Sequence, residues 1–177
     1  MLLNYEFILV GNNNFIDMDL NKIDNNELLS IVKAKVNSFL TENDTNNKCS
    51  FLDNITYYAK EIKFENTIDI LLPLFKKINN EQDNVKIKFL NNISSFSELI
   101  NGFGGYQIIK EQLLPIVASF FNYKSNLKVV DHACDAFISM SNLIKEEDKG
   151  SHVLNTVICK YFIIQYLLMM MMKNVEL

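Results

Sequence analysis

A proline-containing motif occurs twice in this chain, and its recurrence restricts the possible folds more than any other feature. In both copies Leu-Leu-Pro precedes an apolar run, a polar break and a second apolar run, and Pro73 and Pro115 are the only prolines. The prolines are 42 residues apart, and Val85 and Leu127, which open the second runs, each follow their proline by 12 residues. Two features at one spacing indicate a repeated structural unit.

Apolar residues return every three or four positions around these motifs, which is typical of amphipathic helices. The spacing predicts three helix pairs and a fourth pair that begins near Val153 without a partner helix. No alternating strand pattern of useful length follows residue 10, so we expect an all-α fold. The expected core positions are Leu29, Val32, Val36, Phe39, Leu52, Ile55, Ala59 and Ile62 in the first pair, Ile68, Leu71, Leu72, Phe75, Val85, Phe89, Ile93, Phe96 and Ile100 in the second, and Ile109, Leu113, Ile116, Val117, Phe120, Leu127, Val130, Cys134, Phe137 and Ile144 in the third.

Helix pairs that recur roughly every 40 to 47 residues are typical of HEAT and armadillo repeats, whose pairs are stable only when stacked on neighbours. We therefore expect an α-solenoid of about three and a half HEAT repeats, with a bend at Pro73 and at Pro115 in two of the first helices. An Asn-rich, partly disordered leader precedes them, because residues 11–26 are polar and lack a sustained period. The expected boundaries are 1–26 for the leader, 27–64, 65–105 and 106–147 for the three repeats, and 148–177 for the partial repeat.

Residues 27–165 resemble the N-terminal HEAT repeats of the scaffolding A subunit of protein phosphatase type 2A, and the HEAT regulatory subunit of type 4 phosphatase is a close second. The most specific parts are Leu-Leu-Pro in both copies, "EQDNVKIKFLNN" and "VVDHACDAF". The resemblance implies a non-catalytic scaffold that holds a regulatory and a catalytic subunit of a serine/threonine phosphatase together. Two departures are the lysine early in each second helix and a fourth copy without proline. Known scaffolds of the family also have more repeats and bind the catalytic subunit through C-terminal ones.

The resemblance also implies a binding surface, because the family's N-terminal repeats offer the turns inside each helix pair to regulatory subunits. The matching turns here are 41–47, 79–84 and 121–126, and the resemblance places the protein in the cytoplasm and also the nucleus. The residues expected to contact a partner are Glu42, Asp44, Asn80, Glu81, Asp83, Asn122, Tyr123 and Lys124.

Composition and motifs disfavour other classes of function. The net charge of -4 and the absence of arginine argue against nucleic-acid binding, and three widely spaced cysteines fit a reducing compartment. We expect no enzyme activity, cofactor or metal site. Asp131, His132, Cys134 and Asp135 do not converge on one helix face, Cys134 is expected to be a buried small side chain, and Gly102, Gly104 and Gly105 lack the context of a phosphate loop.

Two alternatives to a phosphatase scaffold remain. One is a HEAT or armadillo adaptor with another task, such as transport, whose concave surface would include Asn91 and Asn92. The other is membrane attachment through residues 153–172, which we disfavour because Asn155, Lys160 and Gln165 interrupt that apolar stretch.

Overall fold

The computed structural model describes residues 6–10, 14–18, 25–122, 126–151 and 153. From residue 25 on, every regular element of the described chain is helical, which confirms the all-α prediction for this part. The elements are α1 (Asn25–Thr41), α2 (Thr45–Asp53), α3 (Ile55–Phe75), a 3-10 turn (Ile78–Asn80), α4 (Asp83–Gly102), α5 (Tyr106–Ile108), a π-helical turn (Ile109–Leu113), α6 (Leu114–Ala118), α7 (Leu127–Ser141) and α8 (Glu146–Asp148).

A β-hairpin precedes the helices. The strands β1 (Glu6–Val10) and β2 (Asn14–Met18) pair antiparallel, with Glu6 opposite Met18 and Val10 opposite Asn14. The expectation of a loop throughout 11–26 was therefore wrong for 14–18, and α1 already begins at residue 25. Phe and Ile in both segments favour strands, and Gly11-Asn12-Asn13 between them is a typical turn sequence. The high asparagine content hid this signal.

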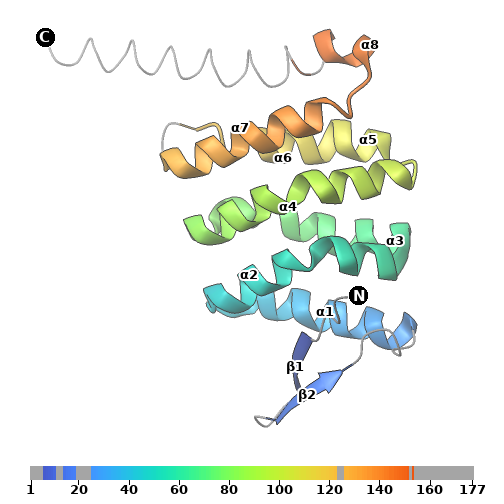
Figure 1. The fold of residues 1–177 in the computed structure, drawn as a ribbon, viewed down its shortest axis with the longest axis vertical. Helices are drawn as coiled ribbons and strands as arrows, with labels where there is room; N and C mark the ends of the chain where they lie inside the picture. The colour runs from blue at the N-terminus through green and yellow to red at the C-terminus, as the bar shows by residue number, and fades with distance from the viewer. Residues whose placement is uncertain (1–5, 11–13, 19–24, 123–125, 152, 154–177) are drawn as a thin grey trace, which may run out of the picture.

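The helices lie in two rows that run side by side through the molecule (Figure 1). The second row contains α2, α4 and α7, each packed on the next, while α1 packs on α3 in the first row. The helix α3 belongs to both rows because it changes direction at Lys63, whose φ is 67°. The Thr67 hydroxyl oxygen lies 2.9 Å from the Ala59 carbonyl oxygen and 2.8 Å from that of Lys63, so its single proton is shared between two backbone acceptors beside the bend.

The first helix of each pair buries the same set of positions. In the second and third pairs these positions are 42 residues apart, as the proline spacing predicts. Two of the expected core positions are displaced by one residue. Leu28 and Thr67 are buried, whereas the predicted Leu29 and Ile68 lie at the margin of the core. The matching sets are Leu28, Val32, Val36 and Phe39; Thr67, Leu71, Phe75 and Ile78; and Ile109, Leu113, Val117 and Phe120.

The second helices also match, but with a different spacing. Their inward sets are Phe51, Ile55, Tyr58 and Ile62; Phe89, Ile93, Phe96 and Ile100; and Ala133, Phe137, Met140 and Ile144, all of them buried except the partly buried Phe137. The last two sets are 44 residues apart, because eight residues separate Phe120 from Val129 whereas six separate Ile78 from Val85.

The prediction that Leu127 and Cys134 belong to the core was therefore wrong. Val129 takes the place equivalent to Val85, with 1% of its surface exposed, whereas Leu127 is 80% exposed and Cys134 is also exposed. The helix α7 carries apolar residues on two faces, so periodicity alone did not identify the buried one.

The two prolines differ in their effect on the helix. Pro115 is the second residue of α6, which begins directly after the π-helical turn, so the type of helix changes next to this proline. Pro73 lies in the last turn of α3, and the only residue of α3 outside helical geometry is Lys63. The predicted bend is therefore absent at Pro73, and Pro115 lies beside a change of helix type.

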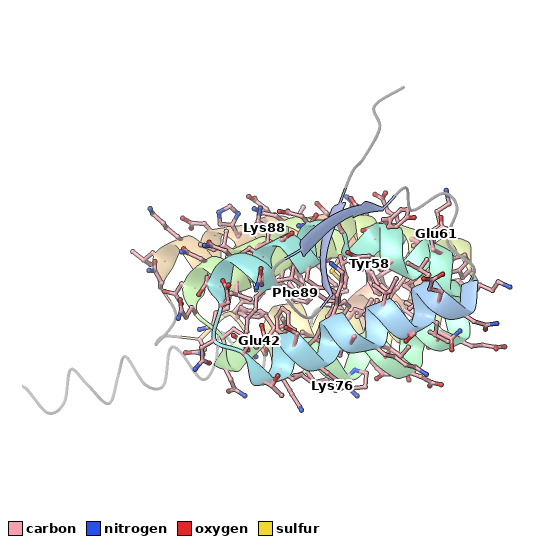
Figure 2. The ribbon with its side chains drawn as sticks, turned by 90° about the horizontal axis from the view of Figure 1, so that it is seen from below. Glu42, Tyr58, Glu61, Lys76, Lys88 and Phe89 are labelled. Carbon is pink, nitrogen blue, oxygen red and sulfur yellow. The ribbon has the colours of Figure 1, made fainter. Side chains whose placement is uncertain are left out.

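Aromatic side chains fill the space between the two rows. The ring of Phe75 lies 5.0 Å from those of Phe89 and Phe96, which joins the first helix of the second pair to α4. Figure 2, a view along the stack, shows Tyr58 and Phe89 between the rows and Lys76 and Lys88 on opposite outer sides. The core is thus continuous from pair to pair, and the charged side chains lie outside it.

Candidate functional site

The turns inside the three helix pairs lie along one edge of the stack (Figure 1). We call this edge the turn ridge and define it as residues 42–44, 76–82, 119–122 and 126. It contains five of the six predicted contact residues that the structure describes, and Asp83 directly adjoins it. Asp83 is the first residue of α4, and Tyr123 and Lys124 lie outside the described residues.

The first turn contains two acidic residues with different roles. Asp44 caps α2, because its carboxylate accepts hydrogen bonds from the backbone N–H groups of Asn46 and Asn47 at 2.9 and 3.2 Å. A carboxylate at this position also interacts favourably with the helix dipole. Glu42 is exposed and lies just after α1. Of these two predicted residues, Glu42 is the more available for a partner.

A partly buried ion pair joins the second turn to the first helix pair. Lys48 Nζ lies 2.7 Å from Glu81 Oε2 and 5.0 Å from the centre of the Phe39 ring. Thr45 adds a hydrogen bond from its hydroxyl to the Gln82 side-chain oxygen at 2.9 Å. Glu81, predicted as a partner contact, is thus engaged within the molecule and links two neighbouring pairs.

The second and third turns are also joined. The Asn79 side-chain amide donates to the Ser119 hydroxyl, which in turn donates to the Ile116 carbonyl at 2.6 Å. Beside this link lies a pocket of about 380 Å³ between the first helices of the two pairs, with Lys76, Glu111 and Gln112 among its lining residues. The pocket offers one cation, one anion and amide groups, which suits polar contacts with a protein surface.

The remaining predicted residues are Asn80 and Asn122 on the ridge and Asp83 next to it. Asn80 and Asn122 are exposed, and Asp83 lies 3.4 Å from Lys86 one helical turn further on. The ridge therefore gathers Glu42, Asn80 and Asn122 on one edge, in three successive turns. It does not bring them together in one cluster.

Sequence reasoning missed the residues that hold these turns to one another, namely Thr45, Lys48, Gln82 and Ser119. A signal for Lys48 did exist, because it precedes Phe51 and Leu52 by three and four residues and so falls on the buried face of α2. A lysine in that position needs an anionic partner. No comparable pattern in the sequence identifies Ser119.

The opposite edge has its own polar link between the third pair and α8. The Tyr106 hydroxyl donates to Asp148 Oδ2 at 2.6 Å and accepts from the Lys145 backbone N–H at 3.2 Å, while Lys110 Nζ lies 2.8 Å from Asp148 Oδ1. Burial raises the pKa of Tyr106, and its hydrogen bond to Asp148 adds to the rise. The pKa of Lys110 is also raised, mainly because it donates to Asp148.

The residues weighed for catalysis or metal binding lie on α7. Asp131, Cys134 and Asp135 are exposed and His132 is partly buried. Neighbouring protein atoms still shield the exposed Cys134 thiol from part of the solvent, which raises its pKa, and the two aspartates raise it further, which disfavours the reactive thiolate. Within the described residues, no group of three or more His, Cys, Asp and Glu side chains is arranged to hold a metal ion.

None of the helices in the described part of the chain combines the length and the apolar character needed to cross a membrane. The segment considered for membrane attachment, 153–172, lies outside the described residues except for Val153. Comparisons with protein-family models, with curated proteins and with solved structures returned no match.

Proposed function

We propose that this chain is an α-solenoid of HEAT type and acts as a non-catalytic scaffold of a type 2A-like serine/threonine phosphatase. Its partners would be a regulatory subunit and the catalytic subunit, which it would hold together. One observation supports the proposal most directly: three successive helix pairs bury matching positions and present their turns along one edge. The identity of the partners rests on the resemblance of the sequence to the phosphatase scaffold.

The solenoid part of the proposal is supported by how the pairs contact each other. The helix α4 packs on α2 on one side and on α7 on the other, so the second helices form a continuous row. Polar links between successive pairs, such as Lys48 with Glu81, add to the apolar contacts. A row built from nearest-neighbour contacts is the basis of repeat proteins and gives an extended surface for partners.

The scaffold part of the proposal assigns the turn ridge as the docking surface. Glu42 and Asn80 project from successive turns, and Asp83 adds a half-exposed carboxylate. Exposed charges at the rim of an interface chiefly steer a partner and fix its orientation. Because the ridge also carries the exposed Lys76 and Lys77, we expect it to select a partner surface of mixed charge that places basic residues against Glu42.

Affinity capture with the full chain tests this function. The ridge variant should be Glu42→Lys combined with Asn80→Lys, since Glu81 and Asp44 are needed for the fold. A matched control is Glu98→Lys, which makes the same charge change as Glu42→Lys at an exposed position of α4 away from the ridge. We expect capture of a phosphatase regulatory or catalytic subunit, a loss of about tenfold in the ridge variant and no loss in the control. Failure to capture any phosphatase subunit would contradict the proposal.

The same experiment separates the adaptor alternative. Asn91 is exposed on α4, away from the ridge. It belongs to the surface that an adaptor of this class would use. Capture of a cargo or assembly protein that is weakened by Asn91→Lys and not by the ridge variant would favour the adaptor.

A further inference from the structure

The connection between the first and the second helix pair is a single strained residue. Lys63 joins the two helical parts of α3 with φ 67° and ψ 166°, a combination that is essentially restricted to glycine. No other non-glycine residue in the described part of the chain has a positive φ. The Lys63 side chain is exposed, so the packing of the helices on both sides of it imposes this conformation.

The connection between the second and the third pair contains glycine instead. Phe103, Gly104 and Gly105 lie between α4 and α5, and the residue with a positive φ, 83°, is Gly104. Glycine adopts such values without steric cost, whereas lysine does not. The first connection therefore carries backbone strain that the second one lacks.

The sequence around Lys63 favours a straight helix. Residues 55–72 include neither glycine nor proline, and Lys60 and Glu61 are good helix formers. In one continuous helix of 21 residues, α3 would be about 32 Å long, and the Ala59 carbonyl would accept a hydrogen bond from the Lys63 backbone N–H. Straightening α3 would relieve the strain, but it would separate the first pair from the second.

The surface that this separation exposes is a matched set of apolar and charged groups. Besides the packing of α2 on α4, it contains the ion pair of Lys48 with Glu81 and another between Asp53 Oδ1 and Lys88 Nζ, which are 3.0 Å apart. These contacts join residues before Lys63 to residues after it. A second copy of the chain offers the same groups in the same arrangement, so its second pair fits the separated first pair.

We propose that two copies of this chain exchange their first helix pairs, residues 25–62, and form a dimer in which α3 is straight. The contacts between the first two pairs are then formed between chains, and the strain at Lys63 is lost in both copies. Exchange of an identical element is a favourable route to a dimer, and short strained connections promote it. Figure 2 shows Glu61, two residues before the bend, far from Glu42 of the turn ridge. The bend thus lies at an edge of the stack, where the first pair can swing away.

Substitutions at Lys63 test the role of the strain. The parent should give more dimer after refolding from urea at about 300 μM than at about 3 μM, as measured by size exclusion with light scattering. Lys63→Gly removes the strain of the bent form and weakens the straight helix, so its dimer dissociation constant should be at least about a hundredfold higher. Lys63→Ala also removes the lysine side chain but keeps the Cβ atom, so it should dimerise like the parent. A parent that stays monomeric, or equal dimerisation of the two variants, would overturn the inference.

Complementary charge variants test whether the first pairs are exchanged. Lys48→Glu and Glu81→Lys each place like charges at the buried ion pair, both within one chain and in any dimer of that variant alone. A mixed exchanged dimer instead has one native pair, and its other pair has reversed but opposite charges. Mixed dimers should therefore predominate when the two variants are refolded together. Native mass spectrometry with one variant isotope-labelled measures their proportion, and labelled with unlabelled parent gives the proportion for random pairing.

The matched control mixes the parent with the double variant Lys48→Glu, Glu81→Lys. Here each chain alone has opposite charges at the ion pair, whereas a mixed exchanged dimer has like charges in both places, so mixed dimers should be rarer than random. Random pairing in both mixtures would mean that the chains associate through another surface, and the inference would then be wrong. Failure to capture a phosphatase subunit would not affect it, because the exchange depends only on contacts of this chain with itself.

Discussion

Lys48 Nζ lies 2.7 Å from Glu81 Oε2, and this ion pair joins the turns of two successive helix pairs. The side chains are only 8% and 19% exposed, and the Phe39 ring covers the ammonium group from 5.0 Å. A lysine buried in this way depends on its carboxylate, since removal from water disfavours the charged form. Part of the turn ridge therefore stabilises the stack and is not free to serve a partner.

The first prediction concerns this ion pair. Glu81→Gln should lower the free energy of unfolding by about 2 kcal/mol, because it leaves a buried ammonium group without its anionic partner. Lys48→Met should cost less, since it removes the buried charge and keeps an apolar side chain of similar length. Urea denaturation of the two single variants and the double variant measures the coupling between the residues. A double variant no more stable than Glu81→Gln would contradict this assignment.

The second prediction tests the register of α7. Val129 is 1% exposed, so Val129→Ala should lower the free energy of unfolding by about 2 kcal/mol through the cavity it leaves. The neighbouring Lys128 is exposed, and Lys128→Ala should change stability by less than about 0.5 kcal/mol. Chemical denaturation of both variants is the measurement. Equal stabilities of the two would mean that α7 buries another face.

The helix pairs and the buried positions of their first helices were largely predictable because the two proline-containing copies keep one spacing through these helices. Leu71 and Leu113 are both fully buried, 42 residues apart, as the proline spacing predicts. The register of the second helix was not predictable in the same way. Both Leu127 and Val129 begin an apolar pattern in α7, and only the length of the preceding turn decides between them.

The candidate site was predictable as a location and not as a set of side chains. The polar, Asn-rich breaks do form turns on one edge, and Glu42 projects as expected. Whether an acid in such a turn faces solvent or a neighbouring pair depends on contacts between residues far apart in sequence. Glu81 turns inward because it pairs with Lys48, which lies 33 residues earlier in the sequence. Local periodicity carries no information about contacts between residues so far apart.

The third prediction concerns the close packing around Gly105, in the turn that follows α4. A Cβ atom at Gly105 would lie 2.6 Å from Ile100 Cγ2, 2.9 Å from Phe64 Cε2 and 3.0 Å from the Ile100 carbonyl oxygen. Gly105→Ala should therefore lower the free energy of unfolding by about 1 to 3 kcal/mol, since the backbone contact cannot relax as a side chain would.

Gly102 provides the matched control for that substitution. It ends α4, and a Cβ atom there would meet nothing within 4 Å. Gly102→Ala should be neutral or stabilise the protein by a few tenths of a kcal/mol, because alanine lowers the entropy of the unfolded chain. Thermal denaturation should show a lower melting temperature for Gly105→Ala and an unchanged or slightly higher one for Gly102→Ala. A similar loss in both would indicate that the turn itself, and not the contact with Phe64, requires glycine.

The fourth prediction concerns the link between the third pair and α8 at alkaline pH. Tyr106 and Lys110 both have raised pKa values in the folded protein, Tyr106 mainly through burial and Lys110 mainly through its hydrogen bond to Asp148. A group that holds its proton more tightly when folded stabilises the folded state fully below its unfolded pKa. That stabilisation is lost as the pH rises through the folded pKa. The unfolded values are about 10 for tyrosine and 10.4 for lysine.

The stabilisation by Asp148 should therefore be constant from about pH 8 to 9.5 and decrease above about pH 10. In Asp148→Asn the pKa of Lys110 loses the main cause of its rise, whereas burial still raises that of Tyr106, so the free energy of unfolding of this variant should fall less steeply than that of the parent. Asp69→Asn makes the same charge change at an exposed position of α3 and should retain the parent's slope. Urea denaturation between about pH 8 and 11.5 compares the three proteins. Parallel profiles for the parent and Asp148→Asn would contradict the role of Asp148, because the hydrogen bond to Lys110 would then contribute nothing that depends on pH.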